Sequence, residues 1–412
     1  MIGRWRFTRS FVRFGCFLVA VVLLWPVPFR PESSKLVVAA SPFLVVCGII
    51  ATGTFKAVAT VGILTGIMSV FRKRWFCRYV CPTGLLQDGA FRIGIRKSAR
   101  WPRFPSVGRY IVVATIVGAL FGYPLLWWMD PLAIFSSAFS VRTSTNILDG
   151  ILAAAGLSVL LVLAVTTGDL WCSRVCPLGA SQDLLDHLRL IVRKKTSRSV
   201  RLKDGAPCSG VSTTRRVFLA VAAGAGLGLL AKRTGNARGD NAPLRPPGSV
   251  KEDTFSGLCL RCGNCIRACP TNIIRPDTGQ AGIAGFLAPV VQFENGYCLE
   301  DCNACTRICP SGAIKSLSLE QKRQHRIGEA LVDGKICFLV QGKSDCDVCV
   351  RSCPFEAVQV YWDENLYIAY PNVDFEKCNG CGACQVYCPT GDIKAIRVWK
   401  TENKILPAER VV

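Results

Sequence analysis

Four short cysteine motifs lie between residues 259 and 388, and the first, CLRCGNCIRACP at 259–270, shows the pattern in full. Each motif holds closely spaced cysteines and ends in Cys-Pro. Their sixteen cysteines form four groups: Cys259, Cys262, Cys265, Cys269; Cys298, Cys302, Cys305, Cys309; Cys337, Cys346, Cys349, Cys353; and Cys378, Cys381, Cys384, Cys388. Three thiolates at intervals of two or three residues, with a fourth before proline, form the spacing that ligates cubane [4Fe–4S] clusters. The motifs therefore predict four such clusters on a chain that transfers electrons.

Two of the motifs depart from the regular spacing. The second widens the interval between Cys298 and Cys302, and the third places Cys337 nine positions before Cys346, yet both keep the C-x2-C-x3-C-P core. A thiolate zinc site normally divides its ligands into two separated C-x2-C pairs. Disulfides are disfavoured because three cysteines within seven residues have few unstrained partners. The spacing thus favours iron–sulfur clusters over zinc and over disulfides.

Composition predicts that part of the chain lies in a bilayer. Of its 412 residues 50% are hydrophobic, and its mean hydropathy is +0.32, which is high for a soluble protein. The net charge of +22 belongs to the first 250 residues, because residues 251–412 hold 18 Lys and Arg against 19 Asp and Glu. The basic residues alternate with apolar runs, a pattern typical of positive-inside membrane topology. We therefore expect contact with membrane lipid and no nucleic acid partner.

Four apolar runs approach the roughly 20 residues needed to cross a bilayer. They predict four membrane-spanning helices, at 11–29, 55–71, 108–128 and 150–171. Basic segments before the first run, after the second and after the fourth are predicted to be cytoplasmic. The segments around 31–41 and 130–149 then face the opposite side. The run 36–54 fits either a half-inserted segment or an additional span.

The apolar region contains an internal repeat of about 95 residues. FCRYVCPTG at 76–84 and WCSRVCPLG at 171–179 share the pattern C-x3-C-P-x-G, and Gln-Asp follows each at 87–88 and 182–183. Equivalent positions in two repeats should lie close together. The repeat therefore predicts a second site at a membrane surface, either a further iron–sulfur cluster or redox dithiols, built from Cys77, Cys81, Cys172 and Cys176. Alternatively, each Cys-Pro merely ends a helix.

The stretch STTRRVFLAVAAGAGLGLLAKR at 212–233 has the form of a twin-arginine export signal, a route that carries folded cargo. It shows no Ala-x-Ala cleavage site, so we expect 217–231 to remain as a short membrane anchor and the cluster domain to be periplasmic. The predicted organisation is a membrane bundle at 1–188, a basic cytoplasmic linker at 189–216, the signal anchor at 212–233, a Pro/Gly linker at 234–250 and a four-cluster domain at 251–412.

Several other cofactors lack support in the sequence. Only His187 and His325 occur, so a haem with two histidine ligands inside the bundle cannot be built. There is no C-x2-C-H haem-attachment motif, no G-x-G-x-x-G and no phosphate-binding loop, which argues against haem, NAD, flavin and nucleotide chemistry. No catalytic residue is predicted. Within the apolar runs Lys56 is the main ionisable residue, and a charge inside a membrane suggests a functional role.

The chain resembles two groups of proteins. The membrane half resembles NapH, and more loosely NosR and the CcoG-type polyferredoxins, through the paired C-x3-C-P motifs. The other half resembles NapG and MauM through LRPPGSVKEDTF at 244–255, LCLRCGNCIRACP at 258–270, CPSGA at 309–313 and CFLVQGKSDCDVCVRSCP at 337–354. The resemblance implies a fused module in the inner membrane that oxidises quinol from the quinone pool. It would feed a periplasmic oxidoreductase of the nitrate reductase type.

The expected fold is an α-helical membrane bundle of four spans and a short signal anchor, followed by an α+β polyferredoxin domain of two two-cluster units. By analogy with related four-cluster subunits, the first motif pairs with the fourth and the second with the third, which would place Cys388 beside Cys259 and Cys353 beside Cys298. Sequential pairing, first with second and third with fourth, is the alternative. The MauM and CcoG resemblance offers a second function, a reductase for maturation of a redox enzyme. A third interpretation treats the clusters as purely structural.

Overall fold

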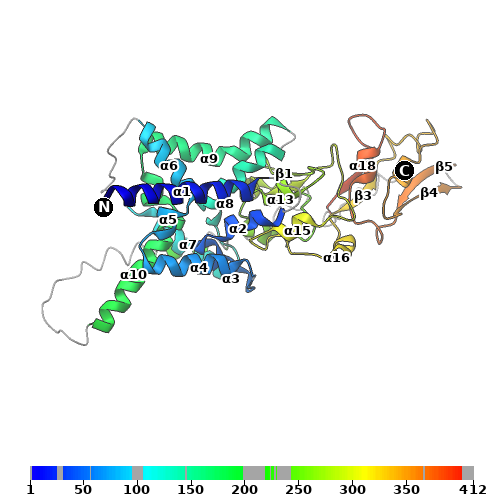
Figure 1. Cartoon of the computed structure of the whole chain (residues 1–412). Helices are drawn as coiled ribbons and strands as arrows, with labels where there is room; N and C mark the ends of the chain where they lie inside the picture. Colours follow the sequence, from blue (N-terminus) through cyan, green and yellow to red (C-terminus); the bar gives the residue numbers. More distant parts are fainter. Residues whose placement is uncertain are drawn as a thin grey trace.

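The computed structural model describes residues 2–25, 31–55, 57–94, 105–143, 146–197, 219–222, 224–226, 229, 243–364 and 367–400. A helical bundle occupies one end of the molecule and a cysteine-rich domain the other (Figure 1). Arg215 and Arg216 of the predicted export signal, and Lys56, lie outside the described residues. In the predicted anchor, residues 219–222 and 224–226 are helical. Gly224 lies against the bundle, because a Cβ there would stand 2.5 Å from the carbonyl oxygen of Ala114.

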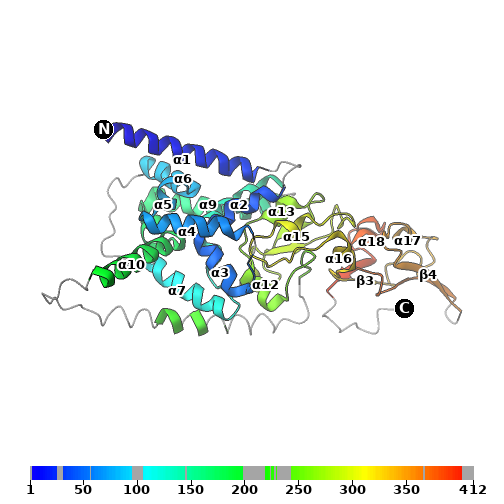
Figure 2. The same ribbon diagram turned by 60° about the horizontal axis from the view of Figure 1, so that its bottom comes forward.

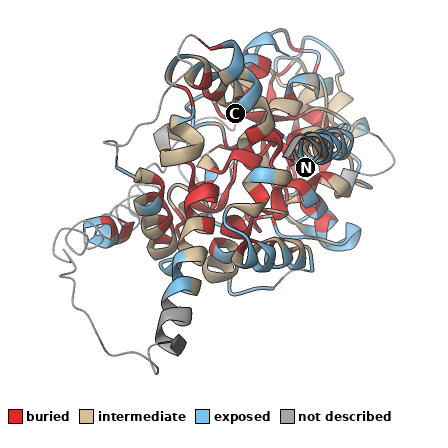
Figure 3. Cartoon of the chain, turned by 60° about the vertical axis from the view of Figure 1, so that its left-hand side comes forward, coloured by how far each residue is buried: buried red, intermediate tan, exposed pale blue. Residues whose placement is uncertain are grey.

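The bundle is built from helices of very unequal length. Its elements are α1 (Ile2–Leu24), η1 (Pro31–Ser33), α2 (Ser34–Ala39), α3 (Pro42–Thr52), α4 (Ala59–Phe71), α5 (Trp75–Tyr79), α6 (Pro82–Ile93), α7 (Val107–Leu120), η2 (Trp127–Met129), α8 (Pro131–Ala138), η3 (Phe139–Thr143), α9 (Ile147–Thr167), the π-helical η4 (Trp171–Val175) and α10 (Pro177–Ser197). Buried segments gather between the helices (Figure 3), whereas α1 is mostly exposed or half-buried from Arg9 onward.

The two sequence repeats pack against each other in an exchanged manner. Helix α6 follows the first C-x3-C-P motif and packs on α9, which precedes the second motif. Conversely α10, after the second motif, packs on α4, which precedes the first. Pro82 and Pro177 stand at the first turn of α6 and α10, where a missing N–H costs nothing. Each Cys-Pro therefore lies between two helices: α5 and η4 end just before it, and α6 and α10 begin at its proline.

Two of the predicted spans, 55–71 and 108–128, are shorter in the structure than in the sequence analysis. Among the described residues, α9 alone is long and apolar enough to cross a membrane, and Pro42–Thr52, Ala59–Phe71, Val107–Leu120 and Pro131–Val141 are shorter apolar helices. The run 55–71 yields only the 13 residues of α4. The run 108–128 is interrupted after Leu120, where Gly122 adopts a φ of 77°. The run 36–54 forms α2 and α3, which are separated at Ser41. Four full-length spans are thus not observed.

The cysteine-rich domain is made of short elements, as the α+β prediction expected. Its helices are α12 (Glu252–Leu258), α13 (Asn264–Ala268), α14 (Gly282–Gly285), α15 (Ala304–Ile308), α16 (Leu319–Gln324), α17 (Val348–Arg351) and α18 (Ala383–Tyr387). Three antiparallel strand pairs join them: β1 (Ile274–Pro276) with β2 (Pro289–Val291), β3 (Glu329–Val332) with β6 (Ile396–Trp399), and β4 (Val358–Asp363) with β5 (Ile368–Val373).

Two predicted domain boundaries need correction. The boundary at 188 falls inside α10, which continues as a helix to Ser197. The residues before 251 are already part of the cysteine-rich domain, because Arg245 is buried and forms an ion pair with Glu252 at 2.5 Å. The backbone N–H of Val291 also donates to the carbonyl of Leu244 at 2.8 Å. The ion pair and the backbone hydrogen bond therefore place the start of this domain at Leu244 or earlier, not at residue 251.

The two parts of the molecule meet through the first cysteine loop (Figure 2). Ser136 of α8 donates its hydroxyl hydrogen to the carbonyl of Cys262 at 3.0 Å, and Arg267 donates to the Ser136 hydroxyl at 3.0 Å. A side chain at position 257 would clash, since a Cβ there would stand 2.5 Å from the ring of Tyr123. The first cysteine loop is thus pressed directly onto the end of the bundle.

Candidate metal centres

Eight of the sixteen cysteines surround two cavities in the half of the domain nearer the bundle. One cavity, with about 420 Å³ of empty space, is lined by Cys259, Cys262, Cys265 and Cys309. The second, with about 390 Å³, is lined by Cys269, Cys298, Cys302 and Cys305. Each cavity therefore gathers three cysteines of one motif and the Cys-Pro cysteine of the neighbouring motif. We call these sets the first and second groups.

The remaining eight cysteines gather in the same way. Cys349 interacts electrostatically with Cys337, Cys346 and Cys388, which we call the third group. Cys384 interacts with Cys378, Cys381 and Cys353, which we call the fourth group. In every group, three cysteines come from one motif and the fourth is the Cys-Pro cysteine of another. The first motif exchanges this cysteine with the second, and the third motif exchanges it with the fourth.

The pairing of the first motif with the fourth, and of the second with the third, is therefore wrong, and the sequential alternative is confirmed. Under the rejected scheme Cys388 would lie beside Cys259, but it lies beside Cys349. The physical reason is local. Cys265 lies in the five-residue helix α13 and Cys269 directly follows this helix, so the two point to different groups, Cys269 to that of the second motif. Cys384 and Cys388 are placed in the same way by the helix α18.

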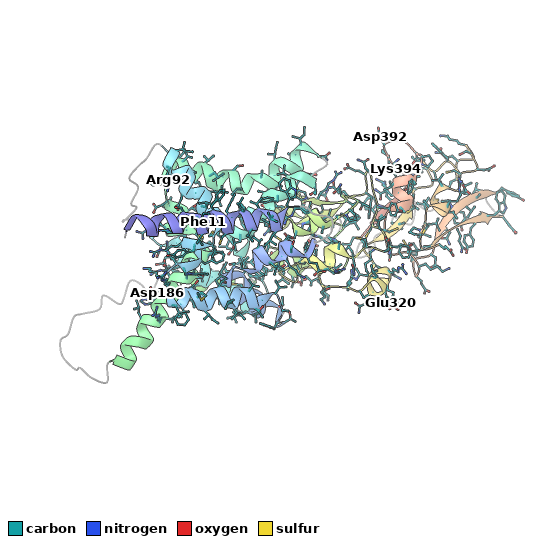
Figure 4. The ribbon with its side chains drawn as sticks, in the orientation of Figure 1. Phe11, Arg92, Asp186, Glu320, Asp392 and Lys394 are labelled. Atoms are coloured by element: carbon teal, nitrogen blue, oxygen red, sulfur yellow. The ribbon has the colours of Figure 1, made fainter. Side chains whose placement is uncertain are left out.

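The groups follow one another away from the bundle in the order first, second, fourth, third. The second and fourth groups are joined directly, since the backbone N–H of Cys298 donates to the carbonyl of Cys381 at 2.9 Å. The views agree that α13 and α15 lie beside the bundle, α18 lies farther out, and α17 with β4 and β5 occupies the far end (Figures 1 and 2). Glu320, Asp392 and Lys394 mark the surface of this arm, whereas Arg92 and Asp186 mark the opposite end of the molecule (Figure 4).

The donor chemistry of these groups fits iron–sulfur clusters. Burial raises the pKa of Cys262 and of Cys381 to about 12, so four lone thiolates would be unfavourable there without a compensating cation. Among the described residues no three His, Cys, Asp or Glu side chains converge as a single metal ion would require. A cubane is larger than one ion and holds its thiolates farther apart. The residues therefore fit the cluster, which supplies one-electron transfer when bound.

A buried lysine and a half-buried arginine lie beside the cysteine groups. Lys322 is 1% exposed and donates a hydrogen bond to the carbonyl of Leu299. Burial raises the pKa of the Cys298 thiol, and the Lys322 ammonium opposes that rise. Beside the first group, burial lowers the pKa of Arg267 to about 10, and its neighbours Cys262 and Cys265 oppose this shift. Cysteine spacing indicates neither role, because Lys322 lies outside the motifs and Arg267 occupies a position of the first motif that carries no ligand.

The four cysteines of the internal repeat also come together, as the repeat predicted. Cys81 interacts electrostatically with Cys77 and Cys172, and Cys176 interacts with the same two thiols. The glutamine after each motif contacts the first cysteine of the other repeat. The Cys172 thiol donates to Oε1 of Gln87 at 2.6 Å, and Nε2 of Gln182 donates to the Cys77 sulfur at 3.1 Å. We call these cysteines the four-thiol site.

The charged residues around the four-thiol site are only partly symmetric. Arg74 forms an ion pair with Asp183 at 2.5 Å and donates to the carbonyls of the second motif. The position that corresponds to Arg74 in the second repeat is Asp169, so the repeat cannot supply the matching cation. Arg13 of α1 takes this place and pairs with Asp88 at 2.6 Å. The Gln-Asp pairs of the repeat were the sequence signal for these contacts.

Comparison with known proteins agrees with this arrangement. A model of the 4Fe-4S dicluster domain matches residues 258–313 and 344–392, and one of a 4Fe-4S binding domain matches 57–101 and 150–198. The MauM ferredoxin-type protein of Methylorubrum extorquens is 31% identical over 51% of this chain and 91% of its own length. The NapG ferredoxin-type protein of Escherichia coli is 33% identical over 47% of this chain and 84% of its own.

The chain belongs to the NapG/MauM family of ferredoxin-type proteins. The NapF ferredoxin-type protein of Escherichia coli is also similar, at 35% identity over 39% of this chain and 90% of its own length. No solved structure matches the chain. One dicluster match covers the first and second motifs, and the other covers the fourth motif and the third from Cys346 on, which agrees with sequential pairing. The other model matches both copies of the internal repeat. Ferredoxin-type electron transfer by [4Fe–4S] clusters is therefore the basic activity of this chain.

Proposed function

We propose that this chain takes electrons from quinol in the cytoplasmic membrane and passes them to a periplasmic oxidoreductase, such as one of the nitrate reductase type. It would thus be an electron-transfer component of a quinol dehydrogenase. In this proposal the first 197 residues are a NapH-like membrane part fused to a NapG-like cluster domain. Quinol gives up two electrons and two protons, and iron–sulfur clusters accept electrons singly.

The observation that carries the proposal is the position of the first cysteine group. Its loop is hydrogen-bonded to α8 through Ser136 and Arg267, so no spacer separates the bundle from the cysteines. The other three groups then lead away from the bundle toward the far tip. An arrangement with one end at a helical bundle and the other at an exposed tip suits transfer from a membrane donor to a soluble acceptor.

The surface of the bundle supports a membrane location. Large apolar side chains are exposed on α1, α4 and α9, where Phe11 is 74%, Leu64 62% and Val162 62% exposed. Contiguous exposed apolar surface of this kind is unfavourable in water. The cluster domain contacts the bundle at the segments 31–41 and 130–149, for example through the ion pairs Arg307–Glu32 and Arg275–Asp149. These segments are the ones predicted to face away from the cytoplasm, so we place the cluster domain in the periplasm.

Each of the four cysteine groups would hold one [4Fe–4S] cluster. Three thiolates of one motif and the Cys-Pro thiolate of its neighbour supply the four ligands in each case. The four-thiol site is a candidate for an additional redox centre, because the 4Fe-4S binding domain model matches both of its repeats. The NapH-like assignment rests on these repeats and on the exchanged packing of α6 with α9 and of α10 with α4.

Two experiments test this function. Membranes that contain the chain, given a quinol analogue without oxygen, should lose the visible absorbance of oxidised clusters, and no loss would count against quinol as the donor. Protease added to sealed spheroplasts together with an iron chelator that does not cross the membrane should digest the C-terminal domain, and an intact domain would contradict the periplasmic placement. Dithionite serves as the control for clusters that are present and reducible.

A reductase for maturation of a redox enzyme is the second candidate. Two observations favour it: MauM ferredoxin-type proteins are as similar to this chain as NapG, and the four-thiol site resembles a pair of redox dithiols. The quinol experiment separates the two. A maturation reductase that draws on another donor would show clusters that dithionite reduces and quinol does not.

A further inference from the structure

A cavity lies where the bundle meets the cluster domain. The cavity is partly open, and its empty volume, including the part open to solvent, is about 500 Å³. Its bundle side is formed by α2, α3, the start of α4 and η2, including Leu44, Gly48 and Trp127. Its other side is formed by Leu260, Pro310 and Ser311 of the cluster domain. The cavity is therefore complete only because the two parts of the chain are docked.

The side chains around this interface cavity suit a flat ring with polar edges. Most of the wall is aliphatic, and the hydroxyl-bearing residues are Thr52, Thr54 and Ser311. Trp127 is fully buried, and its Nε1–H has no hydrogen-bond partner among the described residues. A buried unpaired donor costs roughly 1–3 kcal/mol, which a bound acceptor would recover. Small-molecule sites typically combine an apolar wall with a few such polar groups.

The surroundings also suit a long apolar tail. The outward faces of α3 and α4, which carry cavity-lining residues, expose Val46 and Leu64 to 46% and 62%. Ile67, one turn farther along α4, is 49% exposed. A hydrocarbon chain leaving the cavity along these helices would contact apolar side chains that are exposed on the protein surface. A lipid acyl chain alone would leave the indole N–H of Trp127 unsatisfied, so a ring with oxygen substituents fits better.

The cavity adjoins the first cysteine group directly. Leu260 follows Cys259, and Pro310 follows Cys309, so two residues of the wall are bonded to cysteines of that group. The Ser311 hydroxyl lies 3.5 Å from the Cys309 sulfur. A molecule in the cavity would thus be separated from the first group by the backbone of these two loops and by little else.

We propose that the interface cavity is the quinol-binding site, with Trp127 and the nearby hydroxyls as partners of the ring oxygens. This inference rests on the proposed function and adds the location of the donor. Oxidation of the bound quinol to quinone breaks its two O–H bonds. The two protons go to water at this end of the bundle, and the two electrons leave singly by the one-electron chemistry of the cluster domain toward the periplasmic acceptor.

Gly48 offers a way to close the cavity. A Cβ at this position would stand 3.8 Å from Cζ3 of Trp127, which is ordinary contact, so Gly48→Ala should fit. The longer side chain of Gly48→Leu should occupy the space of the ring. Gly15 on α1 is the matched control, because nothing lies within 4 Å of a Cβ there and Gly15→Leu makes the same chemical change away from the cavity.

The experiment uses the full chain with its clusters and a photoreactive azidoquinone. Labelling of the wild type, Gly48→Ala and Gly15→Leu should map to the peptide 38–59 and be suppressed by excess unlabelled quinone. Gly48→Leu should lose at least nine-tenths of this label while keeping its iron content and its reduction by dithionite. Undiminished labelling of Gly48→Leu, or labelling of the wild type at another part of the bundle, would overturn the inference.

Failure of the site and failure of the function are distinguishable. If quinol reduces the clusters of Gly48→Leu as fast as those of the wild type, quinol is the donor but this cavity is not its site. If the azidoquinone labels 38–59 but quinol reduces no cluster in the wild type, the cavity binds quinone and the proposed direction of electron transfer is wrong.

Discussion

The thiol of Cys172 donates a 2.6 Å hydrogen bond to Oε1 of Gln87, so a glutamine of the first repeat orients the first cysteine of the second. The reciprocal contact, Gln182 Nε2 to the Cys77 sulfur, is 3.1 Å long. Each repeat thereby completes the other, and neither can build the four-thiol site alone. The exchanged packing of the helices that follow the motifs explains why both glutamines reach across.

The two glutamines differ in how much they stabilise the bundle. Gln182 is fully buried and also accepts from the backbone N–H of Phe76 at 3.2 Å, whereas Nε2 of Gln87 is buried without a partner. We expect Gln182→Leu to lower the free energy of unfolding by about 1–3 kcal/mol, because it orphans a buried donor. Gln87→Leu should cost less. Thermal unfolding in detergent, followed by circular dichroism, measures the difference, and equal losses would contradict this account.

Lys322 should raise the reduction potential of the cluster held by the second group. Its buried ammonium lies beside Cys298, and a nearby positive charge favours the more negative, reduced form of a cluster. We expect Lys322→Met to lower one midpoint potential by about 60 mV or more, a tenfold change in a one-electron equilibrium. Redox titration followed by electron paramagnetic resonance measures this shift.

The control for Lys322 is its neighbour Arg323, which is exposed on the same short helix. Arg323→Met removes a charge that water screens, so all midpoint potentials of this variant should equal those of the wild type. A shift of the same size in both variants would show that burial of the charge is unimportant.

Arg267 should couple the bundle to the cluster domain. It joins Asn264 of the cysteine loop to Ser136 of α8, and hydrogen bonds to a charged group are worth about 1.5–3 kcal/mol. We expect Arg267→Met to slow reduction of the clusters by quinol while dithionite still reduces them. Arg351→Met, which alters an exposed ion pair at the far tip, should leave the quinol rate unchanged.

Sequential pairing predicts which substitutions damage the same cluster. Cys309→Ser and Cys262→Ser should alter one and the same resonance signal, although the two residues belong to different motifs. Cys388→Ser should instead match Cys346→Ser. Electron paramagnetic resonance of the four reduced variants tests this, and a shared effect of Cys388→Ser with Cys262→Ser would restore the rejected scheme.

Removal of iron should unfold the cluster domain and spare the bundle. The core of the outer domain is built largely around cysteines, among them Cys269, Cys305, Cys378 and Cys384. Because cluster binding and folding are coupled in small metal-binding domains, chelation should abolish protease resistance of residues 243–400. The bundle has a core of its own that includes Leu24, Val37 and Phe135, and it should stay resistant. Equal digestion of both parts would contradict this prediction.

The cysteine spacing by itself identified the ligand residues and the repeat, because ligand geometry confines thiolates to a few intervals along the chain. The Gln-Asp pair after each C-x3-C-P motif also marked residues that reach the four-thiol site. Hydropathy predicted where the apolar runs lie along the chain but did not predict the residues at which the helices end. Local breaks at Ser41 and Gly122 depend on backbone geometry that a window average does not resolve.

Only the tertiary structure decided which motifs pair and what completes each site. The partner of a Cys-Pro cysteine depends on how a short helix such as α13 is oriented, and spacing carries no such information. Three features join residues far apart in the chain: the buried Lys322, the cavity between Trp127 and Leu260, and the ion pair of Arg13, which fills the place where the second repeat lacks an arginine. Contacts of this kind arise from packing, whereas the motifs are local and can be read from the sequence.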